Sequence, residues 1–215
     1  MIWLDNKIEF PDYKFANQNG ILALGGDLSE ERLIYAYKNG IFPWFSEDDP
    51  IVWYCPSKRM VLFPDDLWVS KSMQKIINKN EFLITENETF EQVIFNCKTI
   101  NRKDDFGTWI TDDMENAYIN LHKRGIAKSI EVWRFVDENK KKKELVGGLY
   151  GVEVNGIFCG ESMFSKVSNT SKLAFTHLVQ NKNYKLIDCQ VYNPHLATLG
   201  AREISRNKFL KILKG

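Results

Sequence analysis

A carboxylate and an amide interrupt a short apolar run near the C-terminal end of the chain. The run is KLIDCQV, residues 185–191, and its polar members are Asp188 and Gln190. Alternate side chains of a β-strand point to one face, so these two groups would share a surface. Burying them would cost free energy unless they found partners, and polar groups held in this way can position a reactant or handle a proton. A solvated edge strand is the alternative interpretation.

Glu161 repeats the pattern in the preceding strand-like segment, FCGESMF. It is a second candidate site residue, and the alternative is a structural acid that is bonded to backbone N–H groups. Four glycines also interrupt this part of the chain: Gly147, Gly148, Gly151 and Gly160. Glycine weakens a strand, and inside one it often marks a bulge or the close approach of a ligand. We therefore expect a splayed sheet with a cleft.

Turn and cap signals predict the elements that position these residues. Asn155-Gly156 suits a two-residue type I′ turn because both residues tolerate positive φ, so it predicts a hairpin. A helix follows, and Ser168, Asn169 or Thr170 can cap it. Its residues at helical spacing are Leu173, Ala174, His177 and Leu178. A strand, a helix and a strand in this order favour an interior position for the KLIDCQV strand.

Further elements are predicted upstream and at the C-terminal end. Ser29 caps a helix that runs to Tyr37 and ends where Gly40 can take a left-handed conformation. The other predicted segments are helices at 70–80, 90–99 and in the tail ISRNKFLKILKG, a strand at 81–85 and a polar loop at 101–105. Thr111 is the predicted N-cap of one more helix. The apolar stripe of that helix consists of Met114, Ala117, Tyr118 and Leu121.

Two tryptophans stand next to these elements. Trp109 precedes the Thr111 cap, so its ring would lie at a helix N-terminus, where anions and nucleotides are commonly received. Trp44 lies in IFPWF beside two phenylalanines. From the sequence alone, packing in a hydrophobic corner of a small domain is the better interpretation for Trp44.

Length and composition indicate an ordinary globular protein. The 215 residues are 44% hydrophobic and 27% charged, enough for one large domain or two unequal ones with a boundary near Pro64 to Val69. There is no run of about 18 apolar residues and no secretion signal, so we expect a cytoplasmic protein without a membrane span. The 4 cysteines are scattered, which predicts reduced thiols and neither a zinc site nor a disulfide framework. The chain also lacks a P-loop and a dinucleotide fingerprint.

A net charge of +1 gives no global attraction to nucleic acid, so any RNA contact must be a local basic patch. The candidates are Lys58 and Arg59, and then Lys71, Lys75 and Lys79 along one face of the helix predicted at 70–80. A solvated helix face is the alternative for the three lysines. The run Lys140 to Lys143 is typical of an exposed hairpin tip, and we do not assign it to RNA binding.

Ten segments, taken in order, resemble one family. They are GILALGGDLS (20–29), NGIFPWF (39–45), GTWIT (107–111), AYINLHKRG (117–125), SIEVW (129–133), LVGGLYGV (145–152), FCGESMFS (158–165), NTSK (169–172), LIDCQ (186–190) and HLATLGA (195–201). In these segments the chain is similar to the bacterial leucyl/phenylalanyl-tRNA–protein transferases. Several of the segments are weak alone, but ten in the same order make the resemblance specific.

The resemblance implies an α+β enzyme with a small N-terminal domain, residues 1–66, and a GNAT-like acyltransferase domain, residues 67–215, with a central mixed β-sheet. It implies that leucine or phenylalanine, and more weakly methionine, is taken from its aminoacyl-tRNA. The residue would be joined to the free α-amine of a protein that begins with Arg or Lys, which creates an N-end rule degradation signal. Leu-tRNA, Phe-tRNA and those proteins would be the partners, with no cofactor, metal or membrane involved.

The resemblance also implies roles for single residues. The amide oxygen of Gln190 would meet the attacking amine, and Asp188 would polarise or orient that amide; the ribose hydroxyl of the tRNA terminus is one candidate for the final proton acceptor. Trp44 and Trp109 would hold the terminal adenosine by stacking. Glu161 would bind an amino or guanidinium group through a charge-assisted bond. The apolar amino-acid pocket beside it would consist of Leu149, Met163, Phe175 and Leu178.

Some positions depart from the family pattern, and two other functions remain open. Tyr54-Cys55 replaces a more usual Trp-Ser, Lys128 stands where His is common, and the C-terminus is short, which affects tRNA contact more than activity. A CoA-dependent N-acetyltransferase would need an R/Q-x-x-G-x-G/A loop before a helix, where this chain has SKVSNTSK, residues 165–172. A non-catalytic binder of charged tRNA or of basic N-terminal peptides would not need the Asp188 and Gln190 pair.

Overall fold

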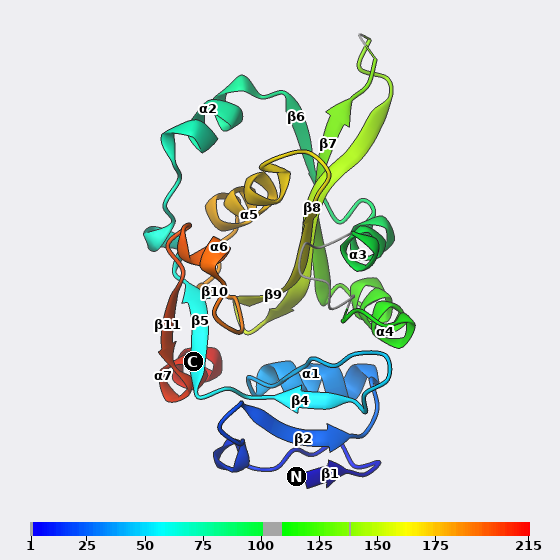
Figure 1. Ribbon diagram of the computed structural model, residues 1–215, viewed down its shortest axis with the longest axis vertical. Coiled ribbons are helices and arrows are strands. Elements are labelled where there is room, and N and C mark those ends of the chain that lie inside the picture. Colours follow the sequence, from blue (N-terminus) through cyan, green and yellow to red (C-terminus); the bar gives the residue numbers. More distant parts are fainter. Residues whose placement is uncertain (1, 101–108, 138) are drawn as a thin grey trace.

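The computed structural model describes residues 2–100, 109–137 and 139–215 and has an α+β fold (Figure 1). A four-stranded sheet belongs to the N-terminal part, and a seven-stranded sheet forms the centre of the rest. The polar loop expected at 101–105 lies outside the described residues, as do positions 107 and 108 of the GTWIT segment.

The small sheet has the order β1-β2-β4-β3. Its strands are β1 (Ile2–Leu4), β2 (Ile21–Gly25), β3 (Phe42–Pro43) and β4 (Val52–Tyr54). Helix α1 (Glu30–Lys38) begins as predicted, because the Ser29 hydroxyl accepts a hydrogen bond from the Arg32 N–H. Gly40 follows the helix with φ of +72°, a left-handed conformation that glycine adopts without a Cβ clash. The predicted start and end of this helix are confirmed.

The larger sheet has the order β11-β5-β10-β9-β8-β7-β6. Its strands are β5 (Lys58–Leu62), β6 (Phe82–Glu86), β7 (Ala127–Phe135), β8 (Lys143–Val154), β9 (Ile157–Ser165), β10 (Leu186–Asp188) and β11 (Arg202–Ser205). The β9 and β10 strands pair in parallel and the other neighbours pair antiparallel, so the sheet is mixed. Since β5 belongs to this sheet, the division between the two sheets falls before Lys58, upstream of the boundary expected near Pro64 to Val69.

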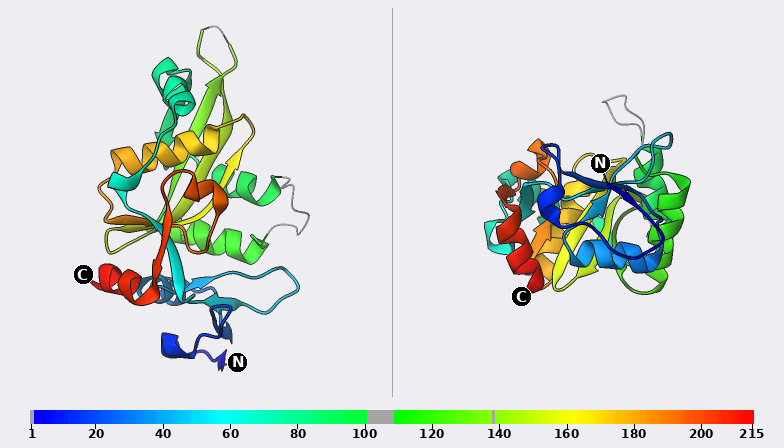
Figure 2. Two further views of the ribbon diagram at one scale, coloured as in Figure 1. Left: turned by 60° about the vertical axis from the view of Figure 1, so that its left-hand side comes forward. Right: turned by 90° about the horizontal axis from the view of Figure 1, so that it is seen from below.

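Helices cover both faces of the larger sheet (Figures 1 and 2). Helix α5 (Thr170–Asn181) lies across one face, while α3 (Phe90–Thr99) and α4 (Asp112–Lys123) lie on the other, near α1. The remaining helices are α2 (Lys71–Lys79), α6 (Pro194–Ala197) and α7 (Arg206–Lys214). The stripe predicted on α4 is buried, with Met114, Tyr118 and Leu121 fully inaccessible and Ala117 nearly so. Helix α4 packs against β7 of the larger sheet and against α3 and α1.

The sheet opens at the end of β10. Strands β9 and β10 pair over Leu186 with Ile157, Ile187 with Phe158 and Asp188 with Cys159, and the pairing stops there. Beyond this point β9 and the segment after β10 are no longer paired, which is the splay expected from the sequence. The hairpin between β8 and β9 is also confirmed, because Asn155 and Gly156 have φ of 51° and 76°, as a type I′ turn requires.

Glycines in β8 serve packing between parts of the protein. A Cβ atom on Gly147 would lie 2.3 Å from Oγ1 of Thr170, and one on Gly151 would lie 2.3 Å from the Cys159 carbonyl oxygen. The pairing of β8 with β9 shifts register between Tyr150 and Gly151, so the expected bulge is present. Of the four glycines singled out in the sequence, Gly160 lines the cavity described below.

The start of α5 differs from the predicted cap. Asn169 is the N-cap residue, with φ of +70°, but its side chain accepts no hydrogen bond there. The Ser165 hydroxyl at the end of β9 accepts a 2.8 Å bond from the Ser171 N–H instead. The Thr170 hydroxyl bonds back to the carbonyls of Val146 and Val167. A residue of the preceding strand therefore caps this helix.

No helix within the described ranges is long and apolar enough to cross a membrane. The cysteines are free thiols, with Cys55, Cys97 and Cys159 buried and Cys189 partly exposed. Burial raises the pKa of the Cys189 thiol, and the nearby Asp188 carboxylate adds to this effect.

Candidate active site

A cavity of about 430 Å³ opens where β9 and β10 diverge. The apolar part of its wall includes Leu149 from β8, Met163 from β9 and Phe175 from α5. Trp44 and Trp109 line it from the N-terminal part and from the start of α4. Because Trp44 is 41% exposed, the hydrophobic-corner interpretation is wrong and its ring is available at the cavity rim.

Leu178 is a correction to the predicted pocket. It is buried, but it lines a second cavity of about 300 Å³ and is absent from the wall of the first. Ser171 and Phe175 reach the first cavity from the N-terminal half of α5. Leu178 follows Ser171 by seven residues, which is about 10 Å along a helix axis. Leu178 lies on the same side of the helix as Ser171, but it is too far along the helix axis to reach the first cavity.

Asp188 and Gln190 do not share a strand face, contrary to the prediction. Strand β10 ends at Asp188, and Gln190 has φ of +61°, a left-handed conformation that is uncommon for a residue with a side chain. The Gln190 N–H donates a 2.9 Å hydrogen bond to Oδ1 of Asp188. The two residues therefore meet through the backbone of a tight turn, and both line the cavity.

Arg59 is the principal partner of Asp188. Its Nε and Nη2 atoms donate to Oδ1 and Oδ2 at 2.8 and 2.6 Å, in a two-pronged ion pair. The two residues are 2% and 0% exposed. The prediction that Arg59 contacts RNA is wrong for this reason, since a guanidinium enclosed with a carboxylate cannot reach a phosphate in solvent. Lys58, the neighbouring candidate, is exposed and pairs with Glu203.

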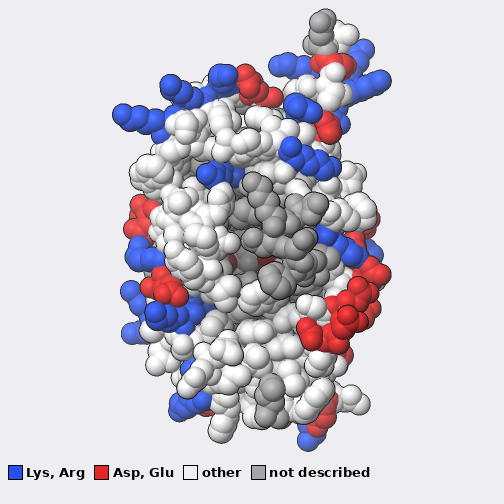
Figure 3. Space-filling model, in the orientation of Figure 1, with Lys and Arg blue, Asp and Glu red and all other residues white. Residues whose placement is uncertain are grey.

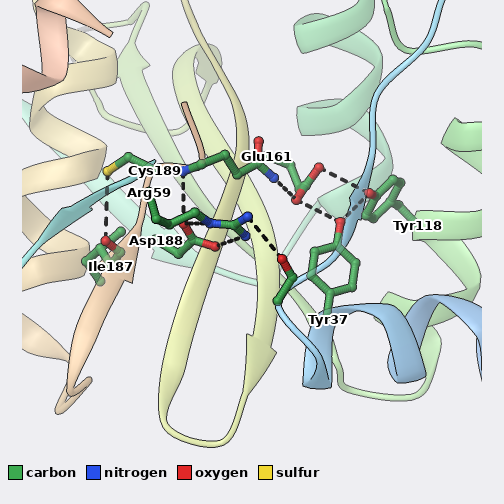
Figure 4. Close-up of polar contacts among 9 residues, drawn as sticks. Tyr37, Arg59, Tyr118, Glu161, Ile187, Asp188 and Cys189 are labelled. Carbon is green, nitrogen blue, oxygen red and sulfur yellow. Dashed lines mark hydrogen bonds and ion pairs between the residues drawn. The ribbon is translucent and has the colours of Figure 1, made fainter. Parts of the chain in front are cut away.

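Glu161 is the centre of a hydrogen-bonded group that includes Tyr37, Tyr118 and the side chain of Gln190. Figure 4 labels Glu161 and the two tyrosines. Its Oε1 accepts hydrogen bonds from the Tyr37 hydroxyl and from Nε2 of Gln190, each at 2.7 Å. Its Oε2 accepts one from the Tyr118 hydroxyl at 3.1 Å, and the two tyrosine hydroxyls also contact each other. The structural-acid alternative placed backbone N–H groups around Glu161, and the partners are side chains instead.

Burial raises the pKa of Glu161 from the usual 4.5 to about 7, although the bonds from Tyr37 and Tyr118 act in the opposite direction. The pKa values of both tyrosines are raised well above 10 by burial and by the Glu161 charge. The group therefore holds a carboxyl that changes charge near neutral pH, in direct contact with the amide of Gln190.

Sequence reasoning missed three residues at this site. Tyr37 and Tyr118 were seen only as helix residues, because their partner Glu161 is 124 and 43 positions away. His195 at the start of α6 also lines the cavity, and burial together with Lys172 lowers its pKa. The HLATLGA segment contained His195, but no local pattern placed it at the cavity.

Basic side chains gather at one end of the molecule, over α2 and the tip of the β7–β8 hairpin (Figure 3). Lys71, Lys75 and Lys79 on α2 are exposed. None of these three lysines lines the cavity. Within the described parts of the chain, no group of three or more His, Cys, Asp or Glu side chains is placed to hold a metal ion.

Two family models match the chain. The model described as "Leucyl/phenylalanyl-tRNA protein transferase" matches residues 61–214, and the model of the N-terminal domain of the same family matches residues 26–57. The chain belongs to this family. It is accordingly an aminoacyltransferase, as its resemblance in ten sequence segments predicted.

Similar proteins support the same assignment. A leucyl/phenylalanyl-tRNA–protein transferase of Flavobacterium johnsoniae is 55% identical over 217 residues, which cover 100% of this chain and 99% of that protein. One of Flavobacterium psychrophilum is 51% identical and covers 100% of both. Among solved structures, a crystal structure of FemX has a TM-score of 0.50 at 12% identity and covers 86% of this chain and 71% of that chain. The predicted GNAT-like fold, with its mixed sheet, is confirmed.

Proposed function

We propose that the chain transfers leucine or phenylalanine, and methionine weakly, from aminoacyl-tRNA to the α-amine of proteins that begin with Arg or Lys. The product would carry an N-terminal degradation signal, and the cytoplasm, where charged tRNA is found, would be the place of action. The observation that carries the proposal is the Gln190 amide, which Glu161 holds at the opening between β9 and β10 beside an apolar wall and two tryptophans.

The reaction needs positioning more than covalent chemistry. The neutral amine attacks the ester carbonyl carbon, a C–N bond forms, and the C–O bond to the ribose breaks. The amine loses one proton and the departing ribose oxygen gains one, so no net proton is consumed. An N-terminal ammonium has a pKa near 7.7 to 8.0, so about a tenth of the amine is already neutral at pH 7. Alignment of the amine with the ester is therefore the main task of the protein.

Gln190 is suited to that alignment. Its nitrogen donates to Glu161, which leaves the amide oxygen as a free acceptor for an N–H of the attacking amine. An amide is a poor base, so Gln190 orients the amine and its lone pair. Asp188 would act on Gln190 through the backbone N–H, not through the side-chain amide. This differs from the role that the family resemblance implied for Asp188.

Trp44 and Trp109 are the candidates to receive the terminal adenosine. Both line the cavity and neither is fully buried, so a base can stack on them. Stacking on an aromatic side chain is worth about 1 to 3 kcal/mol per base. The apolar wall of Leu149, Met163 and Phe175 would hold the amino-acid side chain. Such a wall separates Leu, Phe and Met weakly, since one methylene is worth only about 1 to 3 kcal/mol.

Glu161 would recognise positive charge at the acceptor. A carboxyl with a pKa of about 7 is ready to lose its proton when a cation approaches, because the cation stabilises the charged form. The Arg or Lys at the N-terminus of the acceptor protein supplies such a cation. The exposed lysines of α2 would bind phosphates of the tRNA at a distance from the cavity.

Two features argue against an acetyl-CoA enzyme, and a third argues against a cysteine-based mechanism. The first helical N–H groups that would bind a pyrophosphate are partly used, since Ser171 N–H donates to Ser165. The segment before α5 also has no glycine.

Cys189 lines the cavity, but burial raises its pKa, so its thiol stays protonated and is a poor nucleophile.

Incubation with radiolabelled Phe-tRNA and a peptide that begins with Arg tests the proposal. We expect label in the peptide, little transfer to the same peptide beginning with Asp, and none to an N-acetylated Arg peptide. Thermal protection by acetyl-CoA without transfer of phenylalanine would instead favour an N-acetyltransferase. Retention of Phe-tRNA without transfer would favour a binding protein.

A further inference from the structure

A buried ion pair lies directly behind the turn that carries Gln190. Arg59 on β5 and Asp188 at the end of β10 are joined by two charge-assisted bonds, at 2.8 and 2.6 Å. Desolvation offsets much of the attraction in such a pair, so it is weak evidence for a stabilising role. Its contacts indicate a different role, which concerns the geometry of the active site.

The carboxylate of Asp188 is fully used inside the protein. Oδ1 accepts from Nε of Arg59 and from the Gln190 N–H, and Oδ2 accepts from Nη2 of Arg59. Its side chain is 0% exposed. Asp188 therefore acts on the backbone of Gln190, and its side chain has no exposed surface for a reactant to contact.

The backbone of Gln190 is held from both sides in a strained conformation. Its φ of +61° is in the left-handed region, which a residue with a side chain keeps only when its surroundings enforce it. The N–H is fixed by Asp188, and the carbonyl oxygen accepts a 3.1 Å bond from the N–H of Met60. Met60 directly follows Arg59 on β5. In this conformation the side chain of Gln190 reaches Glu161 at 2.7 Å.

The guanidinium of Arg59 is itself fixed from three elements. Nη1 donates to the carbonyl of Gly40 at 3.1 Å, just after α1. The rings of Phe42 on β3 and Phe209 on α7 lie on the guanidinium, each with its centroid 4.6 Å from the central carbon. Arg59 thus connects the N-terminal part and the C-terminal helix to the residue that bonds the Gln190 N–H. Figure 4 shows its pairing with Asp188.

We propose that Arg59 is a positioning residue of the transfer reaction: it fixes the Asp188 carboxylate, which holds Gln190 in the left-handed conformation that directs the amide to Glu161 and the cavity. The effect on rate rests on the proposed function. The effect on the conformation of Gln190 does not, and it can be measured separately.

The test compares Arg59→Lys with Arg32→Lys in the full-length chain. Lysine keeps the charge but loses the planar fork. Arg32 is the matched control, because it is buried to a similar degree, 0% exposed against 2% for Arg59. It bonds to Lys7, Asp5 and Asp27, none of which lines the cavity, whereas Asp188 does. We expect Arg59→Lys to lower kcat for Phe transfer about 100-fold, with the KM for Phe-tRNA changed less than about three-fold. Arg32→Lys should lower Tm without lowering kcat.

A double variant keeps the test valid if Arg59→Lys does not fold. Arg59→Met with Asp188→Asn removes both buried charges and retains an oxygen for the Gln190 N–H, so it should fold and still show the reduced kcat. Wild-type kcat in either folded variant would overturn the proposal. So would a crystal structure of one of them in which Gln190 keeps its φ and its bond to Glu161, whether or not the wild-type protein transfers phenylalanine. Absence of transfer by the wild-type protein would count against the proposed function alone.

Discussion

The side-chain nitrogen of Gln190 lies 2.7 Å from a carboxylate oxygen of Glu161, and this contact fixes which end of the amide faces the cavity. The charged form of Glu161 can only accept hydrogen bonds, so with that form the nitrogen of Gln190 points toward the carboxylate and its oxygen away. The charge of Glu161 therefore bears on the residue that would orient the amine.

The stability of the protein should depend on pH through Glu161. Its pKa is about 7 in the folded protein because of burial, against a usual value of 4.5. The unfolded chain loses this proton near pH 4.5 and the folded chain near pH 7, so folding stability falls as pH rises through that window. The difference corresponds to about 3 kcal/mol. We expect Glu161→Gln, which cannot ionise, to gain about that much relative to wild type between pH 4.5 and pH 8.

Urea denaturation at a series of pH values measures this gain. Glu31→Gln, at an exposed position on α1, is the control for the loss of one glutamate carboxylate. If the difference in unfolding free energy between Glu161→Gln and wild type did not change with pH, the buried carboxyl would titrate as it does in the unfolded chain, contrary to this prediction.

Removal of the Gln190 amide should lower the rate without weakening tRNA binding. Gln190→Ala loses the acceptor that we assign to the attacking amine, and a loss of about 100-fold in kcat is expected for misplaced reactants. The Kd for Phe-tRNA should change by only a few-fold, since both tryptophans and the α2 lysines are intact. Single-turnover kinetics and filter binding measure the two quantities. A parallel loss of both would place Gln190 among the RNA contacts.

Loss of a tryptophan ring at the cavity should weaken the use of a minimal substrate. Trp109→Ala should raise the KM for an aminoacyl-adenosine analogue by about 10-fold or more, which corresponds to one lost stack. Trp68→Ala is the control, because Trp68 is 59% exposed and does not line the cavity. Equal KM values for the two variants would show that Trp109 serves packing only.

The basic face of α2 should matter only for full-length tRNA. Its lysines are exposed, and charge reversal at Lys71, Lys75 and Lys79 should raise the KM for Phe-tRNA but not for aminoacyl-adenosine, which lacks the distant phosphates. The log–log dependence of binding on salt should also become shallower by about 0.7 to 0.9 per lost phosphate contact. Reversal of Lys208, Lys211 and Lys214 on α7, which lies near α1 and well below α2 in Figure 1, is the control. Identical salt slopes for both triple variants would exclude the α2 face.

The parts of the fold that were predicted from the sequence depend on local signals. The Asn155-Gly156 turn, the Ser29 cap and the α4 stripe were predicted because turn chemistry and helical periodicity act over a few residues. The splay of the sheet was also foreseen, from polar residues and glycines inside strand-like segments. The α5 cap was missed because Ser165, which supplies it, belongs to another element.

The site could be predicted only in part, because its decisive contacts join distant positions. Arg59 and Asp188 are 129 residues apart, so their pairing gives no local signal. Taken segment by segment, the sequence predicts an exposed basic residue at Arg59 and an isolated carboxylate at Asp188. The left-handed turn at Gln190 was hidden by the apparent strand alternation of KLIDCQV. Tertiary bonds to Asp188 and Met60 override that local pattern.

The two cavities make Phe175 and Leu178 a matched pair for testing the amino-acid pocket. Both are buried on α5, one turn apart, but Phe175 lines the cavity at Gln190 and Leu178 lines the other one. Truncation to alanine should destabilise both variants by a similar amount, about 2 to 5 kcal/mol. Phe175→Ala enlarges the first cavity and should raise the ratio of kcat/KM for Phe-tRNA over Leu-tRNA by about 10-fold, because the larger ring gains the added space. Leu178→Ala should leave this ratio unchanged in a competition assay with both charged tRNAs. A shifted ratio in Leu178→Ala and not in Phe175→Ala would move the amino-acid pocket to the second cavity, which Leu178 lines.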